Sequence, residues 1–257
     1  MNLIICGYSG FMGREVAAAA KDDDAVNVVA GVCKSGIAEK LAQSVQIFQS
    51  FKDITNQNKC SQINADCIID FSHPDTTQDM LEFATANKIP VVIATTGQIE
   101  KQMNLINEAS KTIPVFFAHN YSIGITLLVR QAKQIAKTYA GLADIEIVEV
   151  HHNRKLDSPS GTALTIANAM AKEINGSKIV CGRSGNSPRQ ENEITISSVR
   201  MGNICGIHEV HVCTNEECIT LKHEAFSRAV FAKGALEAAK FLVKQSSGLY
   251  GMDDLIS

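Results

Sequence analysis

The stretch Glu149–Thr162 holds the side chains best suited to bind an anion and to move a proton. Its basic side chains fall within five positions: His151, His152, Arg154 and Lys155. Ser160-Gly161-Thr162 then opens an apolar helical pattern, and the free N–H groups at a helix start attract anions. Histidine and lysine also donate protons near neutral pH. The pattern predicts a site for a carboxylate-bearing substrate, the alternative being a solvated basic loop with an ordinary helix cap.

A second motif, Gly7-Tyr8-Ser9-Gly10-Phe11-Met12-Gly13, lies between an apolar run and a helical pattern at the start of the chain. Glycines at this spacing let the backbone turn sharply and approach a pyrophosphate, which the helix start then binds. The motif stands at the first strand–helix turn, where the dinucleotide fingerprint belongs. It predicts a nucleotide-binding turn, against the alternative of a tight turn with a purely structural role.

The end of the second predicted strand bears on which nicotinamide nucleotide is bound. NAD-binding domains usually place an Asp or Glu there, about 20 residues after the glycines, to bind the ribose hydroxyl. Here the strand Val26–Val32 is followed by Cys33-Lys34-Ser35, with no carboxylate. Lys34 and Ser35 suit a 2′-phosphate, which favours NADPH over NADH; the alternative is that Lys34 is a solvated loop charge.

These motifs need elements to position them, and the first half of the chain alternates short apolar runs with helical patterns. We expect strands at 3–6, 26–32, 67–71, 91–94 and 115–117, and helices at 13–21, 75–87 and 100–111. Such alternation is typical of a doubly wound α/β domain, a Rossmann-like parallel sheet covered on both faces. Polar residues follow three of the strands, in Asp70–Pro74, Ala94–Gly97 and Phe117–Tyr121, at the edge where such sheets bind ligands.

The second half has a different pattern. We expect helices at 126–139 and 162–174, a strand at 143–150, consecutive strands at 193–199, 209–213 and 218–223, and a last helix at 229–244. Strands that follow one another without helices indicate a mixed or antiparallel sheet, and so a second domain of the α+β class. The boundary between the two patterns falls near Ser122-Ile123-Gly124.

Composition excludes several classes of protein. Of 257 residues, 45% are hydrophobic and 20% charged, which excludes intrinsic disorder. A net charge of −3 gives no basic surplus for nucleic-acid binding, and no apolar run is long enough to cross a membrane. Without a signal-peptide pattern at the start, we expect a cytoplasmic protein whose eight cysteines are free, buried thiols. We expect no metal site, because one candidate set fits no zinc spacing: His208, His211, Cys213 and Cys218.

At these motifs the chain resembles the dihydrodipicolinate reductases, which act in the diaminopimelate and lysine pathway. The family signature E-x-H-H-x-x-K-x-D-x-P-S-G-T is matched from Glu149 onward. Further segments match in place and order: the glycine-rich turn, Ala94-Thr95-Thr96-Gly97, Ala118-His119-Asn120-Tyr121 and Phe226-Ser227-Arg228. The resemblance covers nearly the whole chain. It implies reduction of 4-hydroxy-tetrahydrodipicolinate (dihydrodipicolinate) to tetrahydrodipicolinate by hydride transfer from NAD(P)H, in a homotetramer.

The resemblance also implies roles for individual residues. His151 and Lys155 match the proton-transferring positions. His152, Gly161 and Thr162 match substrate-binding positions, with Ser160 beside them at the helix cap. The residues at cofactor-binding positions are Gly7, Tyr8, Ser9, Gly10, Phe11, Met12, Lys34, Ala94, Thr95, Thr96, Ala118, His119, Asn120 and Tyr121. The implied domains are 1–122 with 228–257 for the dinucleotide, and 123–227 for substrate binding and oligomerisation.

Departures from the family pattern keep the choice of cofactor open. Phe11 replaces a common arginine that helps to hold a 2′-phosphate, and Cys33 replaces the acidic ribose-binding residue. Two other functions remain as alternatives. A different Rossmann dehydrogenase, such as an aspartate dehydrogenase or an aspartate-semialdehyde-type enzyme, is one; the latter needs a nucleophilic cysteine beside the nicotinamide. A non-catalytic dinucleotide sensor is the other, and it would be expected to lose His151 and Lys155.

Overall fold

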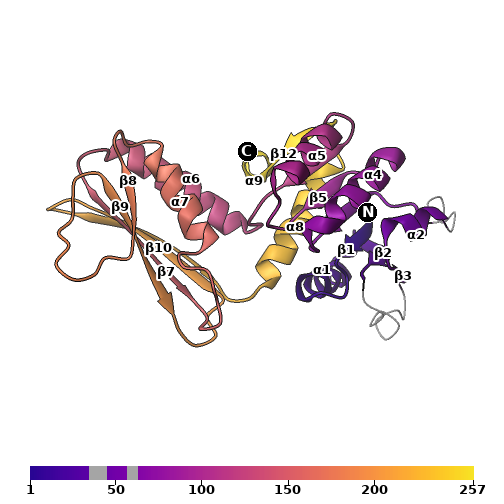
Figure 1. Ribbon diagram of the computed structural model, residues 1–257, viewed down its shortest axis with the longest axis horizontal. Helices are drawn as coiled ribbons and strands as arrows, with labels where there is room; N and C mark the ends of the chain where they lie inside the picture. The colour runs from indigo at the N-terminus through magenta and orange to yellow at the C-terminus, as the bar shows by residue number, and fades with distance from the viewer. Residues whose placement is uncertain (35–44, 57–62) are drawn as a thin grey trace. The chain divides into compact units, whose positions relative to one another are not determined.

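The computed structural model describes residues 1–34, 45–56 and 63–257, so Ser35 and Cys60 lie outside the described residues. The chain divides into two compact units (Figure 1). Unit 1 comprises Met1–Tyr121 and Arg228–Ser257, and unit 2 comprises Ser122–Ser227. The chain therefore leaves unit 1 after Tyr121 and returns to it at Arg228.

Unit 1 is built on a seven-stranded sheet in the order β12-β6-β5-β4-β1-β2-β3, with every pairing parallel. Its strands are β1 (Asn2–Cys6), β2 (Asn27–Val32), β3 (Gln46–Phe48), β4 (Cys67–Asp70), β5 (Val91–Ile93), β6 (Pro114–Phe117) and β12 (Gly248–Tyr250). The central strands β1, β4 and β5 are almost wholly buried, as uninterrupted apolar runs predict for a sheet covered on both faces. This confirms the doubly wound α/β fold.

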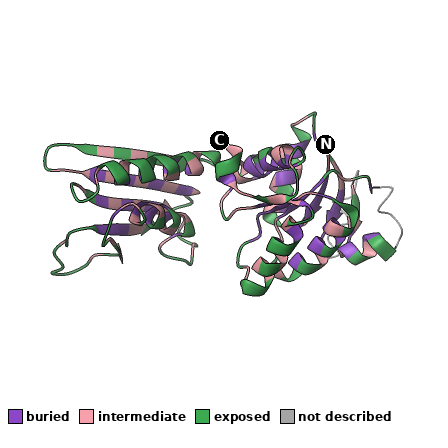
Figure 2. Cartoon of the chain, turned by 90° about the horizontal axis from the view of Figure 1, so that it is seen from above, coloured by how far each residue is buried: buried purple, intermediate pink, exposed green. Residues whose placement is uncertain are grey.

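Helices cover both faces of this sheet. They are α1 (Phe11–Lys21), α2 (Phe51–Asn56), the 3-10 turn η2 (Pro74–Thr76), α4 (Thr77–Asn87), α5 (Glu100–Ser110), α8 (Ala229–Leu242) and α9 (Met252–Leu255). Leu3 and Ile5 of β1 lie in one hydrophobic cluster with α1 and α8. Ile4 and Cys6 lie in the other, with α2, α4 and α5. Alternate residues of β1 therefore point to opposite faces of the sheet and belong to two different hydrophobic cores. Figure 2 shows buried residues on both sides of the sheet.

Unit 2 has a five-stranded mixed sheet in the order β11-β10-β7-β9-β8. Its elements are α6 (Ile123–Thr138), β7 (Asp144–His151), α7 (Gly161–Ala171), β8 (Lys178–Cys181), β9 (Glu193–Arg200), β10 (Gly206–Cys213) and β11 (Cys218–Ala225). Strand β7 pairs parallel with β9, and β9 with β8, whereas β10 runs antiparallel to both β7 and β11. The mixed sheet predicted from consecutive strands is confirmed.

Both helices of unit 2 lie on one face of its sheet (Figure 1). Alternate residues of β7, Ile145 and Ile147, pack there with Ala132 of α6 and Ile166 of α7. The next inward position on β7 is Glu149, which is fully buried. The inward face of β7 therefore changes from apolar to charged at its carboxyl end, and this change marks the candidate site.

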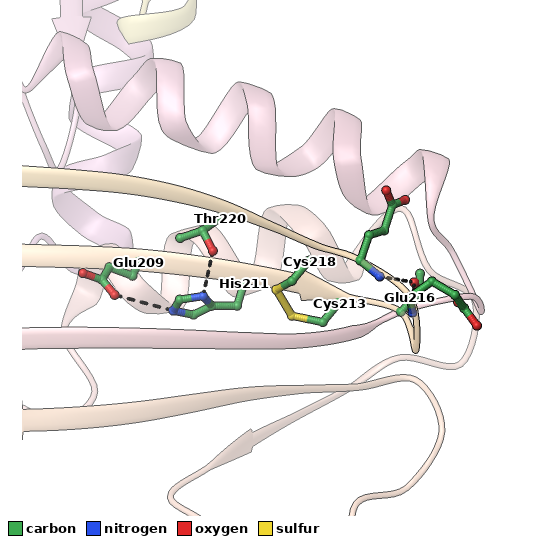
Figure 3. The surroundings of a disulfide bond; sticks show 8 residues. Glu209, His211, Cys213, Glu216, Cys218 and Thr220 are labelled. Carbon is green, nitrogen blue, oxygen red and sulfur yellow. Dashed lines mark hydrogen bonds and ion pairs between the residues drawn. A yellow bond between two sulfur atoms is a disulfide. The ribbon is translucent and has the colours of Figure 1, made fainter.

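The prediction that all cysteines are free and buried is wrong for four of the seven described. Cys213 and Cys218 form a disulfide across the end of the β10–β11 hairpin (Figure 3). They are directly opposed in the register of this hairpin, with Cα atoms 4.0 Å apart. Cys181 is exposed and Cys205 half-buried. Cys6, Cys33 and Cys67 are free and buried as expected.

Candidate active site

The register of the unit 2 sheet gathers the polar residues around the end of β7. Glu149 of β7 is paired with Ser198 of β9 on one side and with His208 of β10 on the other. Two residues further along, His151 is paired with Arg200. Residues at i and i+2 of a strand share a face, so Glu149 and His151 extend the inward row that begins with apolar side chains.

The carboxylate of Glu149 lies at the centre of this cluster. Its Oε2 lies 2.5 Å from Nδ1 of His151, and its two oxygens accept from Nη1 and Nη2 of Arg200 at 2.9 and 2.8 Å. Its Oε1 also accepts from the backbone N–H of Ser160 at 3.1 Å. One carboxylate therefore connects β7 to β9 and to the start of α7.

These contacts set the charge states of the pair. Burial alone would raise the pKa of Glu149, but hydrogen bonds from Arg200 and His151, with the hydroxyl of Ser198 nearby, lower it to about 2. Burial lowers the pKa of His151; the Glu149 carboxylate opposes this shift, and the charges of Lys155 and Arg200 add to it. The net pKa of His151 lies below its usual value. At neutral pH the site without ligand thus holds a charged Glu149 and a largely neutral His151.

A second buried histidine packs against the first. The rings of His151 and His208 meet edge to face with centroids 5.2 Å apart. Burial, reinforced by His151 whenever that ring is protonated, lowers the pKa of His208 to about 3, so this ring is neutral. Its Nε2 lies 3.1 Å from Oγ of Ser160, which also accepts from the N–H of Ala163 and so caps α7. The helix cap is therefore fixed by the same cluster.

The loop between β7 and α7 carries the other predicted residues. Nζ of Lys155 lies 2.8 Å from Oδ1 of Asp157, and the Lys155 side chain is about one-fifth exposed (21%). The backbone N–H of His152 donates to the carbonyl of Ile204, and Nη2 of Arg154 donates to Oδ1 of Asn203. The loop is thus held against the β9–β10 connection, with a lysine ammonium close enough to depress the pKa of His151.

The start of α7 is open to solvent. Gly161 is exposed, and a methyl group added at its Cα would meet nothing within 4 Å. Thr162 follows it and is half-buried. The positive end of the helix dipole is therefore accessible beside the Glu149–His151 cluster, as binding of a carboxylate requires.

In unit 1 the glycine-rich turn has the shape that a dinucleotide needs. Gly7 has φ +82°, and an added Cβ would lie 2.3 Å from the carbonyl oxygen of Phe71. A Cβ on Gly13 would lie 2.2 Å from the carbonyl oxygen of Gly7. Helix α1 begins directly after Gly10. Both glycines thus permit close packing between strand and helix, which leaves the start of α1 facing the strand ends.

A pocket follows this turn along the ends of β1, β2 and β4. Six of the residues lining it are Gly7, Ser9, Gly10, Cys33, Lys34 and Ser72. Asp75 and Asp79 also line it, the latter paired with Lys52 at 2.8 Å. Backbone N–H groups, small side chains and one lysine suit the phosphate and ribose groups of a nicotinamide nucleotide.

The remaining predicted cofactor residues do not share one environment. Tyr8, Ala94, Thr95 and Tyr121 are buried, whereas Phe11, Thr96 and His119 are exposed, and Met12, Ala118 and Asn120 half-buried. Oγ1 of Thr95 accepts from the N–H of Ser72 at 2.7 Å, which joins the ends of β4 and β5. The hydroxyl of Tyr121 donates to the carbonyl of Ile93. The ring of Phe11 is covered by the guanidinium of Arg228 at 5.0 Å.

Sequence reasoning did not single out Arg200, and it gave Glu149 no role. Glu149 begins the reductase signature, so its position was a usable signal. Arg200 lies 51 positions after Glu149, and only the pairing of β7 with β9 brings the two together.

Among the described residues, no group of three His, Cys, Asp or Glu side chains is placed to hold a metal ion. In the same part of the chain, no helix combines the length and apolar character needed to cross a membrane.

Family models divide the chain in two. Residues 1–121 match the N-terminal domain of dihydrodipicolinate reductase, and residues 124–256 match the C-terminal domain. The curated 4-hydroxy-tetrahydrodipicolinate reductase of Clostridium tetani is 40% identical over 100% of this chain and 97% of its own length. The protein of that name from Caldanaerobacter subterraneus is 43% identical over 100% of this chain and 98% of its own.

The same fold occurs in solved structures. Dipicolinate-bound dihydrodipicolinate reductase from Paenisporosarcina sp. TG-14 superimposes with a TM-score of 0.79 at 24% identity, covering 99% of this chain and 98% of that one. Fold and site define a two-unit reductase with a Rossmann-type nucleotide-binding unit. Within that class, the chain belongs to the dihydrodipicolinate reductase family.

Proposed function

We propose that this chain reduces 4-hydroxy-tetrahydrodipicolinate to tetrahydrodipicolinate with a hydride from NADPH or NADH, in diaminopimelate and lysine biosynthesis. The observation that carries the proposal is one cluster at the end of β7, where signature residues Glu149 and His151 lie beside the start of α7. Relatives that bear this activity in their names match the chain from end to end. A dinucleotide sensor that catalyses no reaction would not need this cluster.

The substrate is a ring with two carboxylates, and unit 2 offers complementary charge. We assign one carboxylate to the start of α7, at Ser160, Gly161 and Thr162, with His152 beside it. The exposed position of Gly161 and the positive end of the helix dipole favour an anion there. Lys155 supplies a full positive charge from the preceding loop.

When bound, the reduced nicotinamide would supply a hydride to the conjugated imine that remains once the 4-hydroxyl group of the ring has left as water. The addition leaves an enamine-like carbon that needs one proton, and the protein has to deliver it. We assign this delivery to His151 and to Lys155, whose charge lowers the pKa of His151. The substrate dianion raises the pKa of His151 when it binds, because opposite charge favours the imidazolium.

The direct test is a reductase assay with freshly made product of the synthase that condenses pyruvate with aspartate semialdehyde. Oxidation of NADPH and NADH is followed side by side by the loss of near-ultraviolet absorbance. We expect rapid oxidation of at least one nucleotide. Absence of oxidation by folded protein that binds the nucleotide would overturn the proposal in favour of a sensor.

We propose that NADPH is preferred, because Lys34 lines the nucleotide pocket at the end of β2 and Cys33 stands where the family has the acidic ribose-binding residue. Lys34→Glu is expected to lower the ratio of kcat/KM for NADPH over NADH about tenfold, the scale of one charge-assisted hydrogen bond. Lys21→Glu, in the last turn of α1, is the control. An unchanged ratio in the Lys34 variant would remove this lysine from the 2′-phosphate site.

The assignment of a carboxylate to α7 makes a separate prediction. Thr162→Val keeps the shape of the side chain and removes its hydroxyl, so KM for the dicarboxylate is expected to rise about tenfold. Thr165→Val, one turn further along α7, removes a hydroxyl that bonds only the backbone carbonyl of Gly161 and is the matched control. Equal KM values for the two variants, measured by steady-state kinetics, would leave Thr162 with a structural role only.

We further propose a cytoplasmic homotetramer assembled through the sheet of unit 2. Helices α6 and α7 cover one face of this sheet. The opposite face carries half-buried side chains such as Glu209 and His211, with Lys222 paired to Glu209 at 3.1 Å. Light scattering coupled to size-exclusion chromatography measures the assembly directly.

A further inference from the structure

Glu149 is a charged group with no exposure, and every contact it makes is with a part of the candidate site. Its side chain has 0% relative accessibility. It meets His151 on its own strand, Arg200 on β9 and the backbone of Ser160 at the cap of α7. A buried carboxylate is costly unless it is paired and hydrogen-bonded, and here each of its oxygens has at least two partners.

The charge of Glu149 decides which nitrogen of His151 carries the proton. An ionised carboxylate can only accept hydrogen bonds, and Nδ1 of His151 lies 2.5 Å from Oε2. Nδ1 must therefore carry a hydrogen. In the neutral ring, the other nitrogen, Nε2, then bears the lone pair and is the atom that can take up or release a proton.

The surroundings of Nε2 leave it available. Among the described residues, the ring of His151 has no hydrogen bond other than the one to Glu149. On β10 the neighbouring residue is Gly206, where an added Cβ would lie only 3.0 Å from Nε2. A glycine at this position thus keeps the working nitrogen uncovered. The other charged or titratable groups around the ring are Arg200 from β9, His208 from β10 and Lys155 from the loop.

We propose that Glu149 is a positioning residue for the reduction, which holds His151 in the Nδ1–H tautomer with Nε2 directed at the reacting carbon. The proposal rests on the proposed function for the identity of the reaction. When the substrate dianion is bound, Nε2 takes up a proton from solvent to give the imidazolium, and it delivers this proton to the carbon, which returns the ring to the neutral Nδ1–H form while Glu149 stays ionised throughout. Glu149 touches neither substrate nor nucleotide and acts only through the ring.

Arg200 helps to position Glu149. Its two terminal nitrogens bind both oxygens of Glu149, which fixes the plane of the carboxylate as well as its charge. Nη2 also donates to the carbonyl of Asp157 at 2.7 Å, so the guanidinium ties the loop that carries Lys155 to the sheet. A lysine ammonium could balance the charge but could not form this two-point contact.

The test compares Glu149→Gln with Glu193→Gln. Glu193 is also buried and paired with an arginine, Arg183, but it begins β9 whereas Arg200 ends it. Nitrogen-15 NMR of the ring of His151 is recorded for wild type and both variants without ligand, followed by steady-state kinetics. Glu149→Gln leaves Arg200 without its counter-charge and can weaken folding. The tautomer of His151 is therefore also measured in the wild type and in Arg200→Lys, neither of which removes the charge of Glu149.

We expect the Nδ1–H tautomer in wild type and in Glu193→Gln, and a shift toward Nε2–H in Glu149→Gln. The kcat of Glu149→Gln should fall about 10²-fold with the KM for the nucleotide unchanged, on the scale of lost general acid catalysis. An Nε2–H ring in wild type, or unchanged kcat in a Glu149→Gln protein with a shifted tautomer, would overturn the proposal. If wild type shows the Nδ1–H ring and yet has no reductase activity, the proposed function fails and the tautomer assignment stands.

Discussion

Replacement of Lys155 by alanine is expected to lower kcat by about 10²-fold or more, the scale of a lost general acid. The affinity for the nucleotide should stay within about twofold, because the residue lies in unit 2 and the nucleotide pocket in unit 1. Steady-state kinetics give kcat, and fluorescence titration of NADPH gives the affinity. Both are measured on the same preparation.

The environment of Lys155 supports this expectation. Its partner Asp157 has a side chain that is 59% exposed, and an ion pair at such a position contributes only about 0–1 kcal/mol. The ammonium can therefore leave Asp157 for a substrate dianion at small cost. Lys133→Ala is the matched control, since Lys133 on α6 forms a similar pair with Glu173 at 3.4 Å. Equal kcat values for the two variants would remove Lys155 from the mechanism.

Most of the fold could be predicted because its elements are either long or strongly patterned. The buried strands β1, β4 and β5 are short uninterrupted apolar runs, which a two-sided parallel sheet requires. The elements that were missed are the short strands β3, β8 and β12 and the short helices α2 and α9. Each of these strands lies at the edge of its sheet and is mostly exposed or half-buried, so its apolar pattern is short and weak.

The candidate site could be predicted only where it is contiguous in sequence. His151, Lys155, Ser160 and Thr162 lie in one stretch, so their types and spacing revealed them together. The contact between Glu149 and Arg200 depends on the parallel pairing of β7 with β9, and β9 itself follows α7 and β8 in the chain. No local pattern distinguishes Arg200 from a solvated arginine at a strand end.

The cysteines show the same limit. Cys213 and Cys218 lie in predicted strands, and their pairing follows from the hairpin register, which the sequence did not specify. The tip between them, Thr214–Glu217, was expected to join two strands, but the exact opposition of the two thiols depends on the length of the turn. The expectation of free thiols rested on the reducing conditions of the cytoplasm, and the register of this hairpin contradicts it for Cys213 and Cys218.

The buried ring of His208 is expected to make the sheet of unit 2 less stable in mild acid. The pKa of His208 is about 3 in the folded protein and about 6.5 when the chain unfolds. Between these values the unfolded chain binds one proton more, so the free energy of unfolding rises with pH by up to about 1.4 kcal/mol per unit. The contribution is complete above pH 6.5 and is lost progressively as the pH falls toward 3.

Amide hydrogen exchange of β7, β9 and β10 measures this free energy for unit 2 alone, which avoids treating two units as one transition. His208→Gln removes the titrating ring and should flatten the slope between pH 5 and 6.5. The slope should not vanish, because burial also lowers the pKa values of His151 and His223. His211→Gln, on the outer face of the same strand, should keep the wild-type slope. If the two variants have equal slopes, the protonation of His208 does not limit the stability of the sheet that holds Glu149 and His151.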